Sequence, residues 1–276
     1  MSEGSRTPSA GFEGQPVLSR AAGQRLLDLV RVMHRLRGPD GCPWDREQTH
    51  ESLARHLLEE AHEALEAIDA GDLDRLKDEL GDVLLQVVFH AEMGRQSGTF
   101  DIDDVAEAIV SKLVRRHPHV FGDVRVDSAA QVLVNWEHIK EEEKGEHAVD
   151  EEIPATLPAL GRAAKVQRRA AGAGFDWRTR EGALGKVHEE LQELEEAPPD
   201  QAEHEVGDLL FAVAALARRL DVDPETALRK AVRRFSERFE AMKALAREEG
   251  VMLKDLSEHE LLARWAQIPE GSSGAP

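Results

Sequence analysis

LLEEAHEALEAI (57–68) and ELGDVLLQVVFHA (79–91) are the two stretches that decide the fold of this chain. The first contains an E-x-x-E pair, and the second contains an E-x-x-D pair that runs into an apolar segment. The same order returns later as KVHEELQELEEA (186–197) and EVGDLLFAVAALAR (205–218). A pattern that occurs twice at a long separation indicates an internal repeat. Each copy has the periodicity of two helices joined by a short turn.

Helical periodicity extends over most of the chain. Ala70-Gly71-Asp72 and Pro198-Pro199 are expected to form the turns within the two hairpins. Residues 41–53 read as a loop, and a short extended piece near 119–126 is compatible with the pattern. No alternating strand of useful length occurs, so the predicted fold class is all-α. The expected helices cover residues 24–36, 53–69, 74–95, 101–116, 136–144, 158–172, 181–196, 201–220, 224–248 and 258–267.

The repeat divides the chain into two similar domains. A stretch with Gly145 and Pro154 among acidic residues separates the copies and is expected to be a linker. The two ends of the chain lack helical periodicity and are expected to be disordered tails. The predicted organisation is a tail at 1–22, an N-terminal domain at 23–144, a linker at 145–157, a C-terminal domain at 158–268 and a tail at 269–276.

The amino-acid composition limits the kinds of partner that this chain is expected to bind. Lys and Arg number 35 against 54 Asp and Glu, which gives a formal net charge of −19 at pH 7. An acidic chain repels the phosphate backbone, so no nucleic-acid partner is expected. No run of about 18 apolar residues occurs, so no membrane partner is expected. The single Cys42 excludes an intramolecular disulfide and a Cys-based zinc site, and it fits a reducing compartment such as the cytoplasm.

The acidic pairs predict a metal site in each copy. Residues three apart lie on one helix face about one turn apart, and an antiparallel hairpin can turn two such faces toward each other. Four converging carboxylates would repel one another, whereas Mg²⁺ takes oxygen ligands and leaves an open side for phosphates. The candidate ligands are Glu60, Glu63, Glu79 and Asp82 in the first copy and Glu190, Glu193, Glu205 and Asp208 in the second.

A solvated helix face is the alternative explanation for such acids. A single E-x-x-E pair is common on exposed helices and carries little weight alone. The duplication of a four-acid pattern, each time before an apolar helix, favours metal binding. Gly81 and Gly207 precede the aspartate in each copy. Because glycine inside a helix costs roughly 1 kcal/mol relative to alanine, its repetition suggests a close approach by backbone or ligand.

The chain resembles the MazG family of nucleoside triphosphate pyrophosphohydrolases over nearly all of residues 24–268. The most specific blocks are GCPWDREQTHESL (41–53), LLEEAHE with ELGD, RRHPHVFGD (115–123), WEHIKEEEK (136–144) and LPALGRAAKVQRRAAGAGFDW (157–177). The resemblance implies conversion of a nucleoside triphosphate to its monophosphate and pyrophosphate with Mg²⁺, for which Mn²⁺ can substitute. It also implies four-helix-type bundles that are completed by homodimerisation, and it assigns the metal to the eight carboxylates named above.

The resemblance also points to residues for the nucleotide. Lys186 matches a family lysine implicated in nucleotide binding, and it lies four residues before Glu190. The corresponding position of the first copy holds His56, so the second site is expected to be the main catalyst, with Glu190, Glu193, Glu205, Asp208 and Lys186 as its catalytic residues. The family often has Asn where this chain has Val232 and Lys where it has Arg234, and these departures concern substrate preference rather than reaction class. The full nucleotide set is Lys186, Arg234, Arg238, Trp265 and Lys165.

Two alternative functions differ from pyrophosphate hydrolysis in what they require or predict. A di-iron bundle would need E-x-x-H on two helices. The chain offers Glu59 with His62 but has no counterpart in the second copy. A non-catalytic helical scaffold or nucleotide sensor would bind metal or nucleotide without releasing pyrophosphate. The sequence leaves open the preferred base and sugar, and the choice between removal of aberrant nucleotides and control of a signalling nucleotide.

Overall fold

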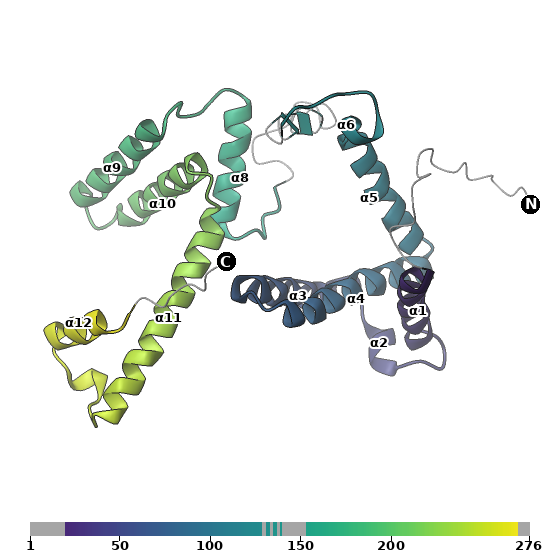
Figure 1. The fold of residues 1–276 in the computed structure, drawn as a ribbon, viewed down its shortest axis with the longest axis horizontal. Helices are drawn as coiled ribbons and strands as arrows, with labels where there is room; N and C mark the ends of the chain where they lie inside the picture. Colours follow the sequence, from purple (N-terminus) through teal and green to yellow (C-terminus); the bar gives the residue numbers. More distant parts are fainter. Residues whose placement is uncertain (1–19, 129–130, 133–134, 137–138, 140–152, 270–276) are drawn as a thin grey trace, which may run out of the picture. The chain divides into compact units, whose positions relative to one another are not determined.

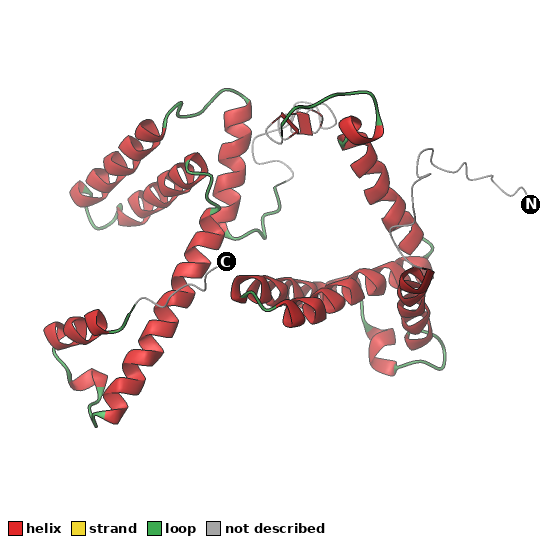
Figure 2. Cartoon of the chain, viewed as in Figure 1, coloured by secondary structure: helices red, strands yellow, loops and turns green. Residues whose placement is uncertain are grey.

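The computed structural model describes residues 20–128, 131–132, 135–136, 139 and 153–269. Within these ranges the chain consists of helices and loops, with no strand (Figure 2). The prediction of an all-α fold is confirmed. Residues 1–19 and 270–276 of the expected tails, and residues 140–152 of the charged helix and linker, lie outside the described residues. None of the described helices is long and apolar enough to cross a bilayer.

The chain divides into two compact units, Met1–Gly145 and Glu146–Pro276. In the first unit, α3 and α4 pair as an antiparallel hairpin, and α1 and α5 pack against α4 (Figure 1). The helices of this unit are α1 (Arg20–Leu36), α2 (Pro43–Glu47), α3 (His50–Ala70), α4 (Leu73–Ser97), α5 (Ile102–Arg116) and α6 (Pro118–Phe121).

The second unit repeats this plan. The pair α9 and α10 forms the hairpin, α8 packs against α10 and α11, and α12 folds back against the long α11 (Figure 1). The helices are α8 (Ala159–Gly172), α9 (Arg180–Glu196), α10 (Ala202–Arg219), α11 (Pro224–Glu248) and α12 (Glu258–Gln267), with a 3₁₀ turn η1 at Leu253–Asp255. Each unit therefore offers one helical hairpin whose facing surfaces carry the acidic pairs.

Local capping sets the start of each hairpin. The Thr49 hydroxyl caps α3 by accepting from the Ser52 amide, and the Thr179 hydroxyl caps α9 by accepting from the Gly182 amide. Both threonines lie the same number of residues before the first glutamate of their copy, so the repeat extends to the helix cap. Gly71 closes α3 with a φ of 69°, a conformation that glycine adopts without a Cβ penalty.

The first unit has its hydrophobic core between α1, the start of α3 and the second half of α4. Met33, Leu53, Val88, Phe89 and Met93 are buried together there. The acidic part of the hairpin lies outside this cluster and is packed through the small buried side chains Ala64 and Ala67 of α3.

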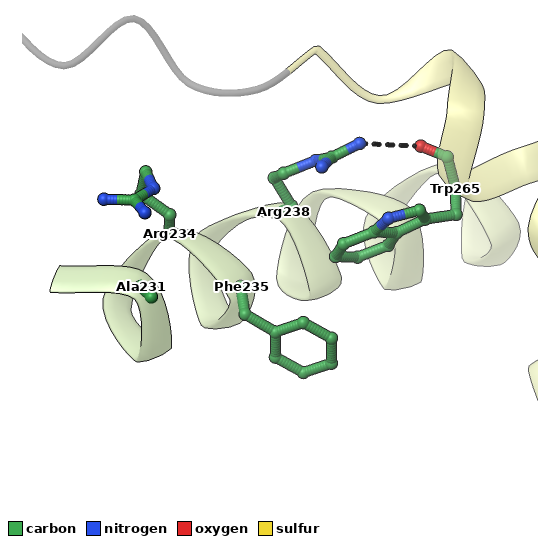
Figure 3. Close-up of a pocket in the computed structure, with 5 residues that line it drawn as sticks. All are labelled: Ala231, Arg234, Phe235, Arg238 and Trp265. Carbon is green, nitrogen blue, oxygen red and sulfur yellow. Dashed lines mark hydrogen bonds between the residues drawn. The ribbon is translucent and has the colours of Figure 1, made fainter. Parts of the chain in front are cut away.

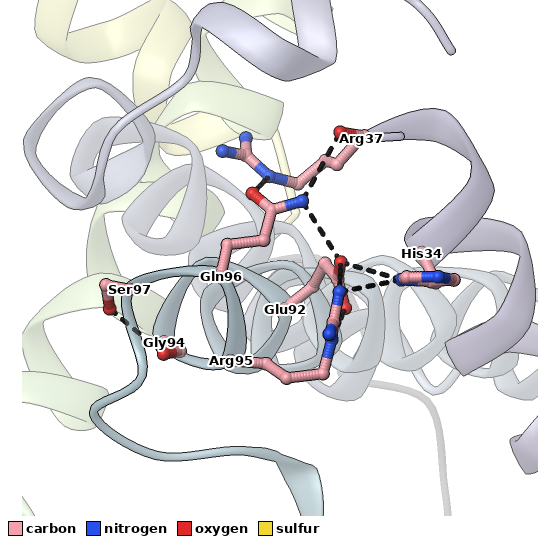
Figure 4. A network of polar contacts seen from close by, with 7 residues as sticks. All are labelled: His34, Arg37, Glu92, Gly94, Arg95, Gln96 and Ser97. Atoms are coloured by element: carbon pink, nitrogen blue, oxygen red, sulfur yellow. Dashed lines mark hydrogen bonds and ion pairs between the residues drawn. The ribbon is translucent and has the colours of Figure 1, made fainter. Parts of the chain in front are cut away.

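A polar network ties the same end of α4 to α1 (Figure 4). The carboxylate of Glu92 is buried and accepts hydrogen bonds from Arg95 and Gln96, and it contacts His34 Nδ1 at 3.0 Å. Burial opposes ionisation, but the bonds from Arg95 and His34 outweigh it and lower the pKa of Glu92. The network fixes α1 on α4 through an ionised, fully paired acid.

The second unit packs mainly through small residues. Its buried apolar side chains include Ala164 of α8, Ala183 of α9 and Ala214 of α10, so the helix backbones approach closely. The loop before α9 is fastened by Asp176, which pairs with Arg218 and lies 2.7 Å from Arg219 Nη2. This clamp fixes the entry to the helix that carries Lys186.

Each hairpin leaves an apolar stripe exposed on its second helix. On α4 the stripe consists of Leu80, Leu84 and Val87, and on α10 it consists of Val206, Leu210 and Val213. Both stripes use the same register relative to the aspartate of their copy, at intervals of four and three residues. Spacings of this kind form one continuous face of a helix, and apolar faces of this kind are normally covered by another helix.

Two local expectations differ from the structure. The stretch 41–53 contains the short helix α2, which begins at Pro43 because proline suits the first turn of a helix. The extended piece considered near 119–126 is wrong for residues 119–121, which belong to the short helix α6 that begins at Pro118. Both errors concern helices of four or five residues, which are too short to show a periodicity.

Candidate metal centre and nucleotide pocket

The first hairpin brings three carboxylates together. Glu60 on α3 and Glu79 and Asp82 on α4 each place a carboxylate oxygen within 4.8 Å of the others. The fourth predicted ligand, Glu63, lies on the same hairpin beside Glu79. The charge of Glu79 raises the pKa of Glu63, and a hydrogen bond between the two carboxyls acts in the same direction. Burial and then the charge of Asp82 raise the pKa of Glu60.

The second hairpin repeats the cluster. Glu190 on α9 and Glu205 and Asp208 on α10 also place carboxylate oxygens within 4.8 Å of one another. Glu190 is buried, and its Oε2 atom has no hydrogen-bond partner. Glu193 lies outside this closest group, but burial and the charge of Glu190 raise its pKa. In both copies, therefore, the folded protein holds carboxylates in a place that disfavours their ionisation.

Basic side chains compensate the two clusters differently. In the second copy, Lys186 Nζ lies 2.7 Å from Glu190 Oε1 and 2.8 Å from Glu189 Oε1. Hydrogen bonds to Glu189 and then Glu190 raise the pKa of the Lys186 amine above its ordinary value. In the first copy, His56 Nδ1 contacts Glu59 at 3.0 Å rather than Glu60. The cation of that cluster lies instead on α4, where Arg75 Nε is 3.1 Å from Glu79 Oε1.

The chemistry of these donors fits a hard divalent cation. All the ligand atoms are carboxylate oxygens, which Mg²⁺ prefers. Carboxylates that repel one another have raised pKa values until a cation neutralises them. The pKa values of Glu60, Glu63 and Glu193 are raised in this way, and one oxygen of Glu190 has no partner. A cation bound to Glu60, Glu79 and Asp82, or to their counterparts in the second copy, would remove this repulsion.

A separate pocket lies between α11 and α12 (Figure 3). It is lined by Ala231, Arg234, Phe235, Arg238 and Trp265. The first four share one face of α11 because their spacings are three, four and seven residues. The indole of Trp265 packs against Phe235 with ring centroids 5.2 Å apart. An aromatic wall beside two guanidinium groups can hold a planar base and an anionic group.

The structure separates the five predicted nucleotide residues into three places. Arg234, Arg238 and Trp265 line the pocket, Lys186 is bound to Glu190 in the second carboxylate cluster, and Lys165 lies on α8 away from the pocket lining. Of the eight predicted metal ligands, six form the two closest groups, which are Glu60, Glu79 and Asp82, and Glu190, Glu205 and Asp208.

A family match and similarity to named proteins both relate this chain to nucleotide pyrophosphohydrolases. Residues 48–121 match the family described as the MazG nucleotide pyrophosphohydrolase domain. The chain is 48% identical over 255 residues to the nucleoside triphosphate pyrophosphohydrolase/pyrophosphatase MazG of Thermotoga maritima, covering 91% of this chain and 98% of that protein. The chain belongs to the MazG family.

Two further relatives of this MazG chain carry the name nucleoside triphosphate pyrophosphohydrolase. The protein of Escherichia coli strain K12 is 44% identical over 250 residues, which is 87% of this chain and 95% of that protein. The protein of Mycobacterium tuberculosis is 35% identical over 265 residues, which is 91% of this chain and 72% of that protein. The resemblance inferred from the sequence blocks is confirmed, and the chain is an enzyme of the pyrophosphohydrolase class.

Two contacts in this MazG chain were not predicted from the sequence. Arg75 lies four residues before Glu79, the same interval that separates Lys186 from Glu190, so its role as a counterion could have been found by applying one rule to both helices. Phe235 lies three residues before Arg238 on a face already marked by basic residues. Its contact with Trp265 depends on how α12 folds back, which the spacing does not contain.

Proposed function

We propose that this MazG chain hydrolyses nucleoside triphosphates to the monophosphate and pyrophosphate, with Mg²⁺ held by its two carboxylate clusters. The observation that carries the proposal is the duplicated group of three converging carboxylates, one member of which, Glu190, is buried with an unpartnered oxygen. The names of the relatives supply the reaction class. The clusters supply a reason why a divalent cation is needed.

In this proposal the acidic residues hold the metal ion and the basic residues bind the phosphates. Mg²⁺, or Mn²⁺ in its place, would neutralise the triphosphate and stabilise charge at the α-phosphorus. Glu190, Glu205 and Asp208 would hold it, and Glu193 stands beside them. With the cation in place, Glu190 no longer needs Lys186, whose amine is then available to a phosphate oxygen. The amine is protonated at neutral pH with or without that contact, because the ordinary pKa of a lysine, about 10.4, already lies far above 7.

The two copies are proposed to differ in turnover. In the second cluster a lysine contacts Glu190 on the first helix of the hairpin, whereas at the matching position of the first cluster His56 contacts Glu59, and the cation there is Arg75, on Glu79 of the second helix. A lysine carries a permanent charge at neutral pH, and a histidine does so only in part. We therefore assign the main catalytic role to Glu190, Glu193, Glu205, Asp208 and Lys186.

A pyrophosphate-release assay over a panel of nucleoside triphosphates tests this proposal. The wild-type protein is compared, with Mg²⁺ and with EDTA, against Glu190→Gln/Glu193→Gln and against Glu60→Gln/Glu63→Gln. We expect release that depends on Mg²⁺ and a far greater loss in the first variant. No pyrophosphate from any nucleotide would favour a non-catalytic scaffold, and equal losses in both variants would refute the inequality of the copies. The nucleotide preferred would also separate removal of aberrant nucleotides from control of a signalling nucleotide.

We also propose that a second copy of the chain covers the exposed apolar stripes and completes a four-helix bundle around each hairpin. The stripes occupy equivalent positions in both units, as expected if both hairpins assemble in the same way. Analytical ultracentrifugation should show a dimer in the wild type and a monomer after Leu84→Glu/Leu210→Glu. Val124→Glu, at an exposed apolar residue in the loop after α6, is the matched control and should remain dimeric. A monomeric wild type would contradict the proposal.

A further inference from the structure

The two helical hairpins differ in the polar contacts that join their helices. In the first hairpin, Arg75 Nη2 on α4 lies 3.0 Å from Glu66 Oε2 on α3, near the turn. At the far end of the same hairpin, His50 Nδ1 on α3 lies 2.7 Å from His90 Nδ1 on α4. Over residues 180–219, all of which the structure describes, no side-chain hydrogen bond or ion pair joins α9 to α10. Polar contacts therefore close the first hairpin at both ends but do not close the second.

Arg75 makes three contacts from the first turn of α4. Its backbone amide donates to the carboxylate of the N-cap residue Asp72 at 3.0 Å. Its Nε atom donates to Glu79 Oε1 at 3.1 Å on the same helix, and its Nη2 atom donates to Glu66 across the hairpin. The planar fork of a guanidinium group allows these two donations in different directions. One side chain therefore joins the helices and also contacts a carboxylate of the first cluster.

The second copy has different residues at the positions that match this contact. Gln201 lies four residues before Glu205, as Arg75 lies four before Glu79, but it is uncharged and is the N-cap residue of α10. The position that matches Glu66 is Glu196, which accepts a hydrogen bond from Gln192 of its own helix at 2.8 Å. The cross-helix contact of the first copy therefore has no equivalent in the second.

Charge compensation in the second cluster stays within single helices. Lys186 contacts two glutamates of α9, and His204 lies 3.4 Å from Asp208 of its own helix α10. Acids that face one another across a hairpin repel, and the repulsion favours separation of the helices unless a positive charge lies between them. The guanidinium group supplies part of this charge in the first copy. In the second copy, a cation held by Glu190 and Glu205 would itself be the link between α9 and α10.

We propose that Arg75 is a positioning residue that joins α3 to α4 and orients Glu79 without metal, whereas closure of α9 on α10 depends on the bound cation. This inference rests on the proposed metal binding and adds to it an unequal need for the metal. The first cluster stays assembled when Mg²⁺ is scarce, and the second assembles when Mg²⁺ binds. Turnover at the second cluster then responds to the Mg²⁺ concentration through the closure of its own hairpin.

Hydrogen exchange of the full-length protein in EDTA tests the role of Arg75. Arg75→Gln should accelerate the exchange of residues 64–79 about fivefold, because the hairpin then opens without breaking the cross-helix ion pair. Glu66→Gln should also accelerate it, and the double variant should exchange no faster than Arg75→Gln, because both changes remove one contact. Lys77→Gln is the matched control. Lys77 lies on the same helix and contacts two exposed aspartates of α4 at 3.6 Å, so its loss should leave the exchange unchanged.

The same measurement in Mg²⁺ tests the unequal need for metal. Mg²⁺ at about ten times its dissociation constant should slow the exchange of residues 190–208 about tenfold, because a ligand that binds only the closed hairpin stabilises it in proportion to its occupancy. Mg²⁺ should also bring Arg75→Gln to within about twofold of the wild type, because cation and guanidinium compensate the same acids. Arg75→Lys should exchange as fast as Arg75→Gln in EDTA, because a point charge does not span both carboxylates.

Two results in EDTA would overturn the proposal. They are an unchanged exchange rate in Arg75→Gln, and full protection in Arg75→Lys, which would show that charge alone is needed. Electron paramagnetic resonance of Mn²⁺ keeps this test separate from the proposed function. A wild type that binds no Mn²⁺ would refute the proposed metal binding, and the comparisons in EDTA would still decide the role of Arg75. Mn²⁺ that binds without slowing the exchange of residues 190–208 would refute the present inference alone.

Discussion

Replacing Lys186 by Met should destabilise the metal-free protein, and Mg²⁺ should largely reverse the loss. The Lys186 amine is 2.7 Å from a Glu190 carboxylate whose side chain is 6% exposed, so the change leaves a buried charge without its partner. Hydrogen bonds to charged groups contribute about 1.5–3 kcal/mol. Lys186 itself is 32% exposed, which places the expected cost at the lower end, about 1.5 kcal/mol. The contact with the exposed Glu189 adds little.

Differential scanning calorimetry in EDTA and in saturating Mg²⁺ measures this effect. For a unit of this size, 1 kcal/mol corresponds to about 4 °C in Tm, so Lys186→Met should lower the Tm of the second unit by about 6 °C in EDTA. The difference should shrink in Mg²⁺, because the cation then compensates Glu190.

Lys243→Met provides a matched control for this experiment. Lys243 is also 32% exposed and lies 2.7 Å from Glu240, but that carboxylate is 64% exposed, so the loss should be under about 0.5 kcal/mol. An equal Tm for Lys186→Met and wild type in EDTA, or a gap that Mg²⁺ leaves untouched, would refute the reasoning.

Three further changes test the electrostatics of the two units. The raised pKa of Glu63 contributes stability that is complete below the ordinary glutamate pKa of 4.5 and is lost as the pH rises through the raised value. The Tm of the metal-free protein should therefore rise on acidification, and Glu63→Gln should make the Tm depend less on pH. An unaltered slope would exclude this origin. Glu92 has the opposite sign, because its lowered pKa contributes stability above 4.5 that is lost as the pH falls through the lowered value. Urea unfolding should show Glu92→Gln about 2 kcal/mol less stable at pH 7, with a smaller gap in acid. Asp176→Asn should cost the second unit about 2 kcal/mol by leaving Arg218 and Arg219 without their shared carboxylate, and an unchanged urea midpoint would show that the clamp is dispensable.

The sequence by itself determined the helices and their repetition. Apolar periodicity located the long helices to within a few residues, and α11 (Pro224–Glu248) and α12 (Glu258–Gln267) have the predicted bounds. Spacings of three and four residues placed each acidic pair on one helix face. These properties are local, because they depend on the regular geometry of one helix, and so they can be derived from one stretch of chain at a time.

The tertiary structure decided which side chains meet across helices. It placed Glu60 rather than Glu63 in the closest group of the first copy, and it directed His56 to Glu59 while Lys186 reached Glu190. It also tied Arg238 to the end of α12 and left Arg234 exposed, although both occupy one face of α11. Contacts between helices depend on how the axes pack, on where a loop returns the chain and on the rotamer each side chain adopts. None of these follows from the spacing of residues along a single helix.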